Sequence, residues 1–142
     1  MSLLENGGTE FALTLLVNRF FVCLDDRRYA DLAGLFAASG VWHRQGVALE
    51  GPEKICEALQ TRPVSLTTRH LVTNVVPVVE SADMAQAAMY VTVFADDGPQ
   101  ATGPLPMALP LQIGDYRARF VLRDEWRIAE LRGESTFRRI NR

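Results

Sequence analysis

The stretch TTRHLVTNVVPVVESADMAQAAMYVTVF, residues 67–94, decides the fold of this chain, because the sequence pattern changes here from helical to strand-like. Residues 71–79 and 87–94 are rich in β-branched side chains, which favour strands, and the segment 80–83 between them is typical of a turn. The sequence therefore predicts a long antiparallel hairpin. Pro77 indicates a bulge or a sheet edge in its first strand, since proline cannot donate a ladder hydrogen bond.

Two more strands are predicted after this hairpin, over residues 109–123 and 126–138, with a tight turn at Asp124-Glu125. The first of them alternates apolar residues with arginines, which predicts one buried face and one face of guanidinium groups. The preceding segment, 96–106, contains three prolines and two glycines and is typical of a loop.

The N-terminal half is predicted to be mainly helical. Apolar residues at helical spacing predict a first helix over 9–25, preceded by a loose leader over 1–8. A second, shorter helix is expected over 29–40, followed by a short strand over 40–46. A Gly-Pro-Glu sequence opens a third helix, expected within 51–62.

This order of elements predicts an α+β fold. Three N-terminal helices pack in the concave face of a strongly curved antiparallel or mixed sheet, in the order helix, helix, strand, helix and four long strands. There is no internal repeat and no linker, so residues 9–142 are expected to form a single domain.

The composition excludes several classes of function. The chain has 142 residues, of which 48% are hydrophobic and 23% charged, and its net charge of −2 argues against nucleic acid or anionic membrane as a partner. The apolar run 11–24 contains Asn18 and Arg19 and is too short to span a bilayer. Cys23 and Cys56 lack the spacing of a zinc site or disulfide framework, which favours reduced thiols in the cytoplasm.

Three segments, 25–42, 68–74 and 116–128, give the chain a resemblance to the SnoaL-like group of the nuclear transport factor 2-like superfamily. The resemblance extends from about Thr9 to Ile140 and implies a cystatin-like cone with a central cavity. Members of the superfamily include dehydratases, ketosteroid isomerase, polyketide cyclases, dioxygenase small subunits and non-catalytic binders, so the fold alone does not fix the function.

Asp25 and Asp26 lie where the first predicted helix ends. One of them is expected to cap the second helix, which leaves the other carboxylate free. The helix dipole and partial burial are both expected to raise the pKa of Asp25.

His70 lies near the start of the predicted hairpin, where a lone histidine is more often a core residue than a catalyst. The resemblance favours a catalytic role for His70 instead, because scytalone dehydratase and similar lyases bring an aspartate from the end of the first helix together with a strand histidine inside the cavity. Asp25 and His70 match these positions. The chain has Leu24 where a tyrosine precedes that aspartate, and no second histidine on the next strand, which argues against scytalone itself as substrate.

Six further residues are candidates for substrate contact, four aromatic and two polar. They are Phe20, Trp42, Tyr90, Tyr116, Asn74 and Arg117. The assignments of Asn74 and Arg117 depend on strand register, because a slip of one residue reverses the face. His43 follows Trp42 and is expected at the surface or at the mouth of the cavity.

The first functional hypothesis is a lyase or isomerase, a dehydratase or cyclase, in which His70 transfers a proton and Asp25 orients it. The substrate would be a small hydrophobic hydroxy-carbonyl compound of polyketide or steroid type. The alternatives are a non-catalytic small-molecule binder or dimerisation domain, and the small subunit of a ring-hydroxylating dioxygenase. No cofactor or metal is implied, since the sequence contains neither a phosphate-binding loop nor a metal-ligand motif.

The basic residues are distributed unevenly. Fourteen of the 15 are arginine, and eight of those lie between Arg117 and Arg142. Arg117 and Arg119 are expected on the outer face of the sheet, where Glu130 is a possible cross-strand partner. Because relatives commonly dimerise through this face, we expect a homodimer or higher homo-oligomer formed there.

Overall fold

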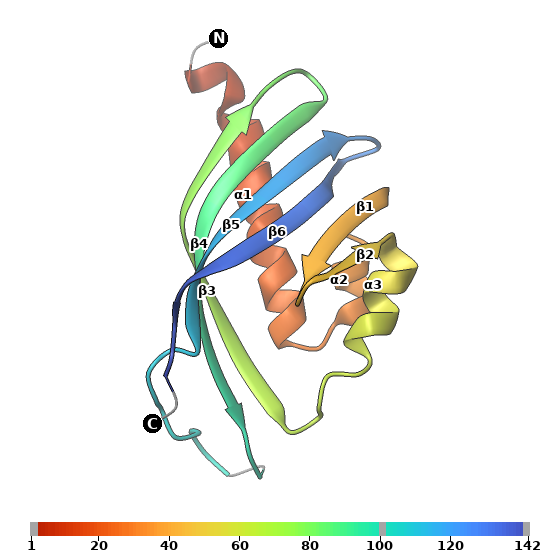
Figure 1. The fold of residues 1–142 in the computed structure, drawn as a ribbon. Coiled ribbons are helices and arrows are strands. Elements are labelled where there is room, and N and C mark those ends of the chain that lie inside the picture. Colours follow the sequence, from red (N-terminus) through yellow and green to blue (C-terminus); the bar gives the residue numbers. More distant parts are fainter. Residues whose placement is uncertain (1–2, 100–101, 141–142) are drawn as a thin grey trace.

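The computed structural model describes residues 3–99 and 102–140 and has three helices against one six-stranded sheet (Figure 1). The elements are α1 (Leu3–Asp25), α2 (Tyr29–Ala33), β1 (Phe36–Arg44), β2 (Val47–Glu50), α3 (Pro52–Leu59), β3 (Leu66–Val79), β4 (Met84–Asp97), β5 (Gln112–Leu122) and β6 (Trp126–Arg138). The predicted α+β class is confirmed.

The sheet has the order β2-β1-β6-β5-β4-β3. Only the β1–β6 pairing is parallel and the others are antiparallel, which makes the sheet mixed. The predicted hairpin is confirmed as β3–β4, with Leu66 opposite Asp97 and Val79 opposite Ala85. Pro77 lies on β3, which is an edge strand, as its missing N–H requires.

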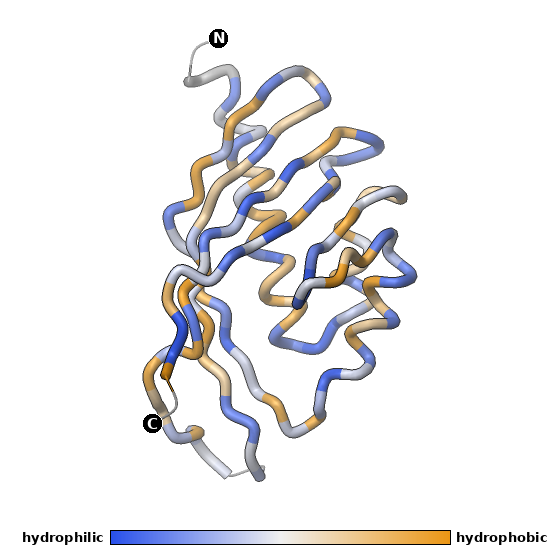
Figure 2. Tube along the Cα trace, viewed as in Figure 1, coloured by the Kyte–Doolittle hydropathy of each residue, from blue (hydrophilic) through white to orange (hydrophobic). Residues whose placement is uncertain are grey.

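The core lies between α1 and the concave face of the sheet, where the helix crosses the strands (Figure 1). Leu13, Val17 and Phe20 of α1 are almost fully buried. Alternate residues of β4, such as Met89 and Val91, face them, and the alternation of apolar and polar residues is visible along the strands in Figure 2.

By length and composition alone, α1 is the one described helix that is apolar enough to cross a membrane, over Asn6–Asp25. A helix buried in the core of a domain has the same composition. The sheet covers its apolar side, and Leu13 is 0% exposed, so packing accounts for the apolar character of α1.

The prediction that residues 1–8 form a loose leader is wrong for the described part, because α1 begins at Leu3. Gly7 and Gly8 are inside the helix, and a Cβ at either position would meet no atom within 4 Å. Each glycine costs the helix only about 1 kcal/mol. The later turns of α1 are held in helical form by burial, and extending an existing helix is easier than starting a new one, which offsets that cost.

The second helix is shorter than predicted and ends at Ala33. Its expected last turn belongs to β1, where Phe36 is paired with Ile128 of β6. The sequence also did not reveal β2, which pairs with β1 through a turn at Gln45 and Gly46, both with positive φ. Leu35 and Phe36 fit a helix stripe and a buried strand equally well, and the pairing with β6 decides between them.

Gly40 is required where β1 meets β6. A Cβ at this position would lie 2.7 Å from the Ile128 carbonyl oxygen and 3.0 Å from that of Ala37. We expect Gly40→Ala to lower the free energy of unfolding by about 1–3 kcal/mol, the usual cost of overpacking, in urea titrations followed by circular dichroism. Gly8→Ala, where there is free space in a helix, should raise it by up to about 1 kcal/mol. Equal effects of the two substitutions would contradict this account.

Candidate active site

A cavity of roughly 630 Å³ opens between the C-terminal end of α1, the β1–β2 hairpin and the inner face of the sheet. Phe21 and Leu24 of α1 form part of its apolar lining, and Trp42 and Tyr116 line it from the strands. His70 of β3 is also at its wall. Of the six residues predicted to contact substrate, Trp42 and Tyr116 therefore line this cavity.

Asp25 and His70 form a hydrogen-bonded pair at this cavity. Asp25 Oδ1 lies 2.6 Å from His70 Nδ1, and the His70 backbone N–H donates to Asp25 Oδ2 at 2.8 Å. The Thr68 hydroxyl donates to Asp25 Oδ1 at 2.8 Å. The side chains of His70 and Asp25 are only 11% and 8% exposed, so the carboxylate is held by three donors away from bulk water.

Local backbone structure positions Asp25. The Arg28 N–H donates to the Cys23 carbonyl and the Arg27 N–H to the Leu24 carbonyl, and Arg27 has a φ of 60°. This is a Schellman motif with arginine in the left-handed position where glycine is usual. It places Asp25 in the last turn of α1, with its side chain toward β3.

The prediction that Asp25 or Asp26 caps the second helix is wrong. No side chain caps α2, and its N-cap residue is Arg28. The Schellman motif connects the two helices instead. It leaves Asp25 as the cavity carboxylate and Asp26 exposed at the surface.

The pKa of Asp25 is lowered, whereas the sequence predicted that it would be raised. Burial by itself raises the pKa of this carboxyl group. The hydrogen bonds from the His70 ring, the His70 amide and the Thr68 hydroxyl favour the ionised form, and together with the charge of the imidazole they outweigh burial. Asp25 is therefore a carboxylate at neutral pH.

An ionised Asp25 fixes the tautomer of His70. A carboxylate can only accept hydrogen bonds, so His70 Nδ1 carries the proton. Nε2 then has the free lone pair and, among the described residues, no hydrogen-bond partner. The ring lies 5.2 Å from that of Phe21, which helps to hold its plane.

Tyr116 contributes a phenol to the same cavity. Burial raises the pKa of Tyr116, so the hydroxyl stays protonated and can donate a hydrogen bond. Gly133 leaves room for its ring, because a Cβ there would lie 2.5 Å from Cζ of Tyr116. No pattern in the sequence indicates this role for Gly133, since the contact connects β5 and β6 across the sheet.

Sequence reasoning also missed Thr68 and Arg62. Thr68 is on the same face of β3 as His70, so strand alternation could have identified it. Arg62 follows α3 and donates to the Leu24 carbonyl at 2.9 Å, to the Tyr29 hydroxyl and to the Thr68 hydroxyl. No periodicity in the sequence predicts such a contact.

Four of the predicted substrate contacts lie elsewhere. Phe20 is 1% exposed and packs edge-to-face on Trp42 inside the core, since its neighbour Phe21 takes the cavity side of α1. Tyr90 is 49% exposed, because the inward residues of β4 are the odd-numbered ones. Both expectations of cavity lining are wrong.

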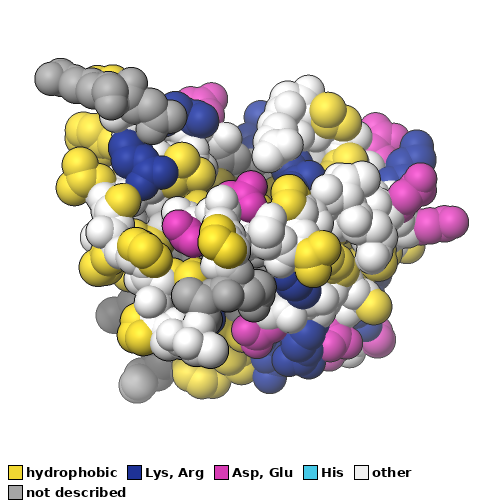
Figure 3. Space-filling view, turned by 90° about the horizontal axis from the view of Figure 1, so that it is seen from below, with side chains coloured by type: hydrophobic (Ala, Val, Ile, Leu, Met, Phe, Trp, Pro, Cys, Tyr) yellow, Lys and Arg dark blue, Asp and Glu magenta, His cyan; other side chains and the backbone are white. Residues whose placement is uncertain are grey.

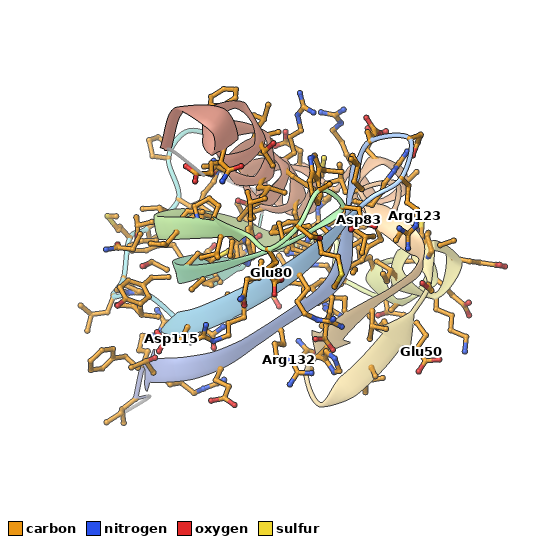
Figure 4. All side chains as sticks on the ribbon, turned by 90° about the horizontal axis from the view of Figure 1, so that it is seen from above. Glu50, Glu80, Asp83, Asp115, Arg123 and Arg132 are labelled. Atoms are coloured by element: carbon orange, nitrogen blue, oxygen red, sulfur yellow. The ribbon has the colours of Figure 1, made fainter. Side chains whose placement is uncertain are left out.

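Asn74 and Arg117 are also outside the cavity. Asn74 has a φ of 56° within a register shift of β3 between Thr73 and Val76, so it is exposed on a bulge. Arg117 is exposed on the outer face of β5, near Asp115, which is labelled in Figure 4. The bulge at Gly114 comes before Arg117 and does not turn it inward.

His43 lies at the mouth of the cavity, within the predicted range of positions. Its Nε2 is 2.9 Å from Glu130 Oε2, and Glu130 also pairs with Arg119 and Arg132. Figure 4 shows Arg132 between β6 and β1. Hydrogen bonds from His43 and then from Arg132 lower the pKa of Glu130 to about 2.

No group of three or more histidine, cysteine, aspartate or glutamate side chains within residues 3–99 and 102–140 is arranged to hold a metal ion. Cys23 and Cys56 are both free thiols.

The chain matches the SnoaL-like domain family over residues 10–132. A comparison with curated proteins finds no match. Among solved structures, a provisionally named scytalone dehydratase from Novosphingobium aromaticivorans has 16% identity and a TM-score of 0.78, over 93% of this chain and 87% of that one.

Hexachlorocyclohexane dehydrochlorinase LinA-type3 from Novosphingobium barchaimii is similar at 18% identity and a TM-score of 0.78, over 97% of this chain and 93% of that one. A Mycobacterium tuberculosis protein of unknown function has 23% identity and a TM-score of 0.71, over 87% of this chain and 73% of that one. At these identities the likeness shows a shared fold.

The lowered pKa of Asp25 makes a prediction for acid stability. We expect Asp25→Asn to cost about 2 kcal/mol of unfolding free energy at pH 5, because it removes hydrogen bonds to a buried charge. A lowered pKa stabilises the fold above the ordinary value of 3.8 and ceases to do so as the pH falls through the folded-state value. The difference between wild type and variant in urea titrations should therefore shrink from pH 5 to pH 3. Asp26→Asn, at an exposed position, is the matched control and should show a difference near zero throughout.

Proposed function

This chain belongs to the SnoaL-like domain family, and on that premise we propose that it is a cofactor-independent lyase or isomerase in which His70 is the acid–base catalyst. The observation that carries the proposal is the 2.6 Å contact between His70 Nδ1 and Asp25 Oδ1 at the cavity wall. Two of the similar structures bear the names of elimination enzymes, a dehydratase and a dehydrochlorinase, which supports this class of reaction.

The proposed reaction is the elimination of water from a small β-hydroxy carbonyl compound. His70 Nε2 removes a proton from the carbon beside the carbonyl group, and the C–H electron pair becomes the new C=C bond. The C–O bond breaks, and the imidazolium returns the proton to the departing hydroxyl, which leaves as water. In an isomerisation the same nitrogen would return the proton to a different carbon.

Asp25 and Tyr116 would support the two charges that develop. The Asp25 carboxylate stabilises the imidazolium and keeps its ring oriented, as in other carboxylate-oriented histidines. The protonated Tyr116 hydroxyl can donate a hydrogen bond to the substrate carbonyl oxygen as it gains negative charge. A non-catalytic binder would have no need for a histidine held by a buried carboxylate.

The outer face of the sheet is the proposed surface for self-association. Tyr90, Arg117 and Arg119 are exposed on it, and Arg119 pairs with Glu130. Together with the two free thiols, which suit a reducing compartment, this favours a cytoplasmic homo-oligomer.

Self-association is tested by sedimentation velocity. Wild type should sediment as a dimer or larger species, and the double substitution Tyr90→Glu and Arg117→Glu should shift it toward monomer, because it places like charges on the proposed contact. Arg19→Glu, at an exposed position of α1, should leave the assembly intact. A monomeric wild type would refute the proposed interface.

The catalytic proposal is tested with a panel of small β-hydroxy ketones in D2O, with ¹H NMR following both enone formation and exchange of the protons beside the carbonyl. We expect His70→Ala to slow both processes by at least about 100-fold, the usual contribution of general acid–base catalysis. Asp25→Asn should lower kcat more than it changes KM. Arg19→Gln, far from the cavity, should retain wild-type rates. Unchanged turnover in His70→Ala would contradict the proposal.

A further inference from the structure

The wall of the cavity is strongly basic although the whole chain is acidic. Four arginines line the cavity, and the only carboxylate among its described lining residues is that of Glu134. In the ladder Arg132 and Glu134 are opposite Arg117 and Asp115 of the outer face, so their two opposite charges are directed away from the cavity. The other three arginines give the lining a charge of about +3, against −2 for the chain. The Asp25 carboxylate lies behind His70 and is already paired with it.

Two of the four arginines have partners in the protein. Arg132 pairs with Glu130 at 2.9 Å. Arg138 donates to the side chains of Gln112 and Ser135, each at 3.1 Å. The donors of both arginines are therefore at least partly used. Arg138 bonds only to neutral groups, so its charge, like those of Arg44 and Arg62, is not balanced by an ion pair among the described residues.

Arg44 is the one of these four arginines whose guanidinium has no polar partner among the described residues. It is half-buried on β1, and its guanidinium carbon lies 5.5 Å from the centre of the Trp42 ring. Within the described residues it has neither a hydrogen-bond acceptor nor a carboxylate in ion-pair range. Burial lowers the pKa of Arg44, and the charge of Arg62 lowers it further. Two cations thus line one cavity, and neither has a carboxylate in ion-pair range among the described residues, an arrangement that costs free energy unless a ligand supplies an anion.

Arg62 is the fixed member of this pair. Three of its five N–H groups are used by the Leu24 carbonyl, the Tyr29 hydroxyl and the Thr68 hydroxyl. Nε–H and one Nη2–H are left over for a ligand. Because the Thr68 hydroxyl also donates to Asp25, Arg62 stands one hydrogen bond away from the carboxylate that orients His70.

We propose that Arg44, assisted by Arg62, binds the carboxylate group of the substrate, so that the ligands of this cavity are small organic acids. A guanidinium offers two parallel N–H groups that match the two oxygens of a carboxylate. One carboxylate would neutralise one of the two facing cations and use donors that are otherwise left to water. The apolar residues Phe21, Leu24 and Val93 would cover the body of the molecule.

This inference rests on the proposed function for the reaction. It adds a second point at which the protein holds the substrate, besides His70. An acid group held at Arg44 gives the substrate a fixed direction in the cavity, with the rest of the molecule toward Phe21 and His70. It also adds an acid group to the small hydrophobic hydroxy-carbonyl compound expected from the sequence. Binding itself needs no turnover and can be measured separately.

The test is calorimetric titration at low salt and pH 7 with three matched pairs of probes: benzoate and benzamide, cinnamate and cinnamamide, 2-naphthoate and 2-naphthamide. At least one acid should bind at least about ten-fold more tightly than its amide, and 0.5 M NaCl should weaken that preference. Arg44→Gln should bring the acid close to the amide, while Arg19→Gln, which removes a charge away from the cavity, should retain the preference. Circular dichroism confirms that each variant is folded.

Three results would overturn the inference. The first is that no acid binds better than its amide in any of the three pairs, absence of binding included. The second is that the preference for the acid survives in Arg44→Gln, and the third is that phenyl phosphate binds more tightly than benzoate through Arg44. His70→Ala separates this inference from the proposed function. It should keep the preference for acids, so an Arg44-dependent preference with turnover unaffected by His70→Ala would sustain the binding site and refute the catalytic role.

Discussion

The three hydrogen bonds to the Asp25 carboxylate are the interaction on which the rest of this structure depends. They connect the last turn of α1 to Thr68 and His70 of the edge strand β3. Arg27 and Arg62 add further hydrogen bonds between the end of this helix and the start of the hairpin. The cavity exists because the helix is held at this strand while the sheet curves away from it (Figure 1).

Two features of its surroundings oppose the negative charge of the Asp25 carboxylate. It lies at the C-terminal end of a helix, where the dipole opposes negative charge, and burial opposes it as well. Only the donors of β3 reverse this balance and lower its pKa. A site so arranged holds the proton of the neutral His70 ring on Nδ1 and directs the lone pair away from Asp25, on Nε2.

The sequence predicts those parts of the molecule that depend on neighbours along the chain. The β3–β4 hairpin, the buried face of β5 and the meeting of Asp25 with His70 follow from patterns and from the family resemblance. Asn74 and Phe36 were misplaced because a bulge and a parallel pairing, both set by other strands, decide their positions. No feature of the sequence indicates a role for Arg44, since an unpartnered charge is recognisable only once its surroundings are known.

The scarcity of lysine has a structural explanation beyond a subunit interface. Several arginines bind backbone carbonyl oxygens: Arg27 those of Pro63, Val64 and Leu66, Arg62 that of Leu24, Arg139 that of Leu109. A planar group with five donors can satisfy two or three carbonyls at the ends of elements, whereas an ammonium is a point charge. These arginines tie the turn after α1, the segment after α3 and the loop before β5 to the body of the fold.

Arg44 departs from that use, because it reaches no carbonyl oxygen and no carboxylate among the described residues and lies half-buried at the cavity wall. Figure 3 shows that the surface at the lower end of the molecule mixes hydrophobic, basic and acidic side chains. In a chain that uses its arginines so fully inside the fold, a half-buried guanidinium without an acceptor is best explained by a ligand. The sequence analysis assigned the excess of arginine to the outer face of the sheet. Arg44 belongs instead to the cavity wall.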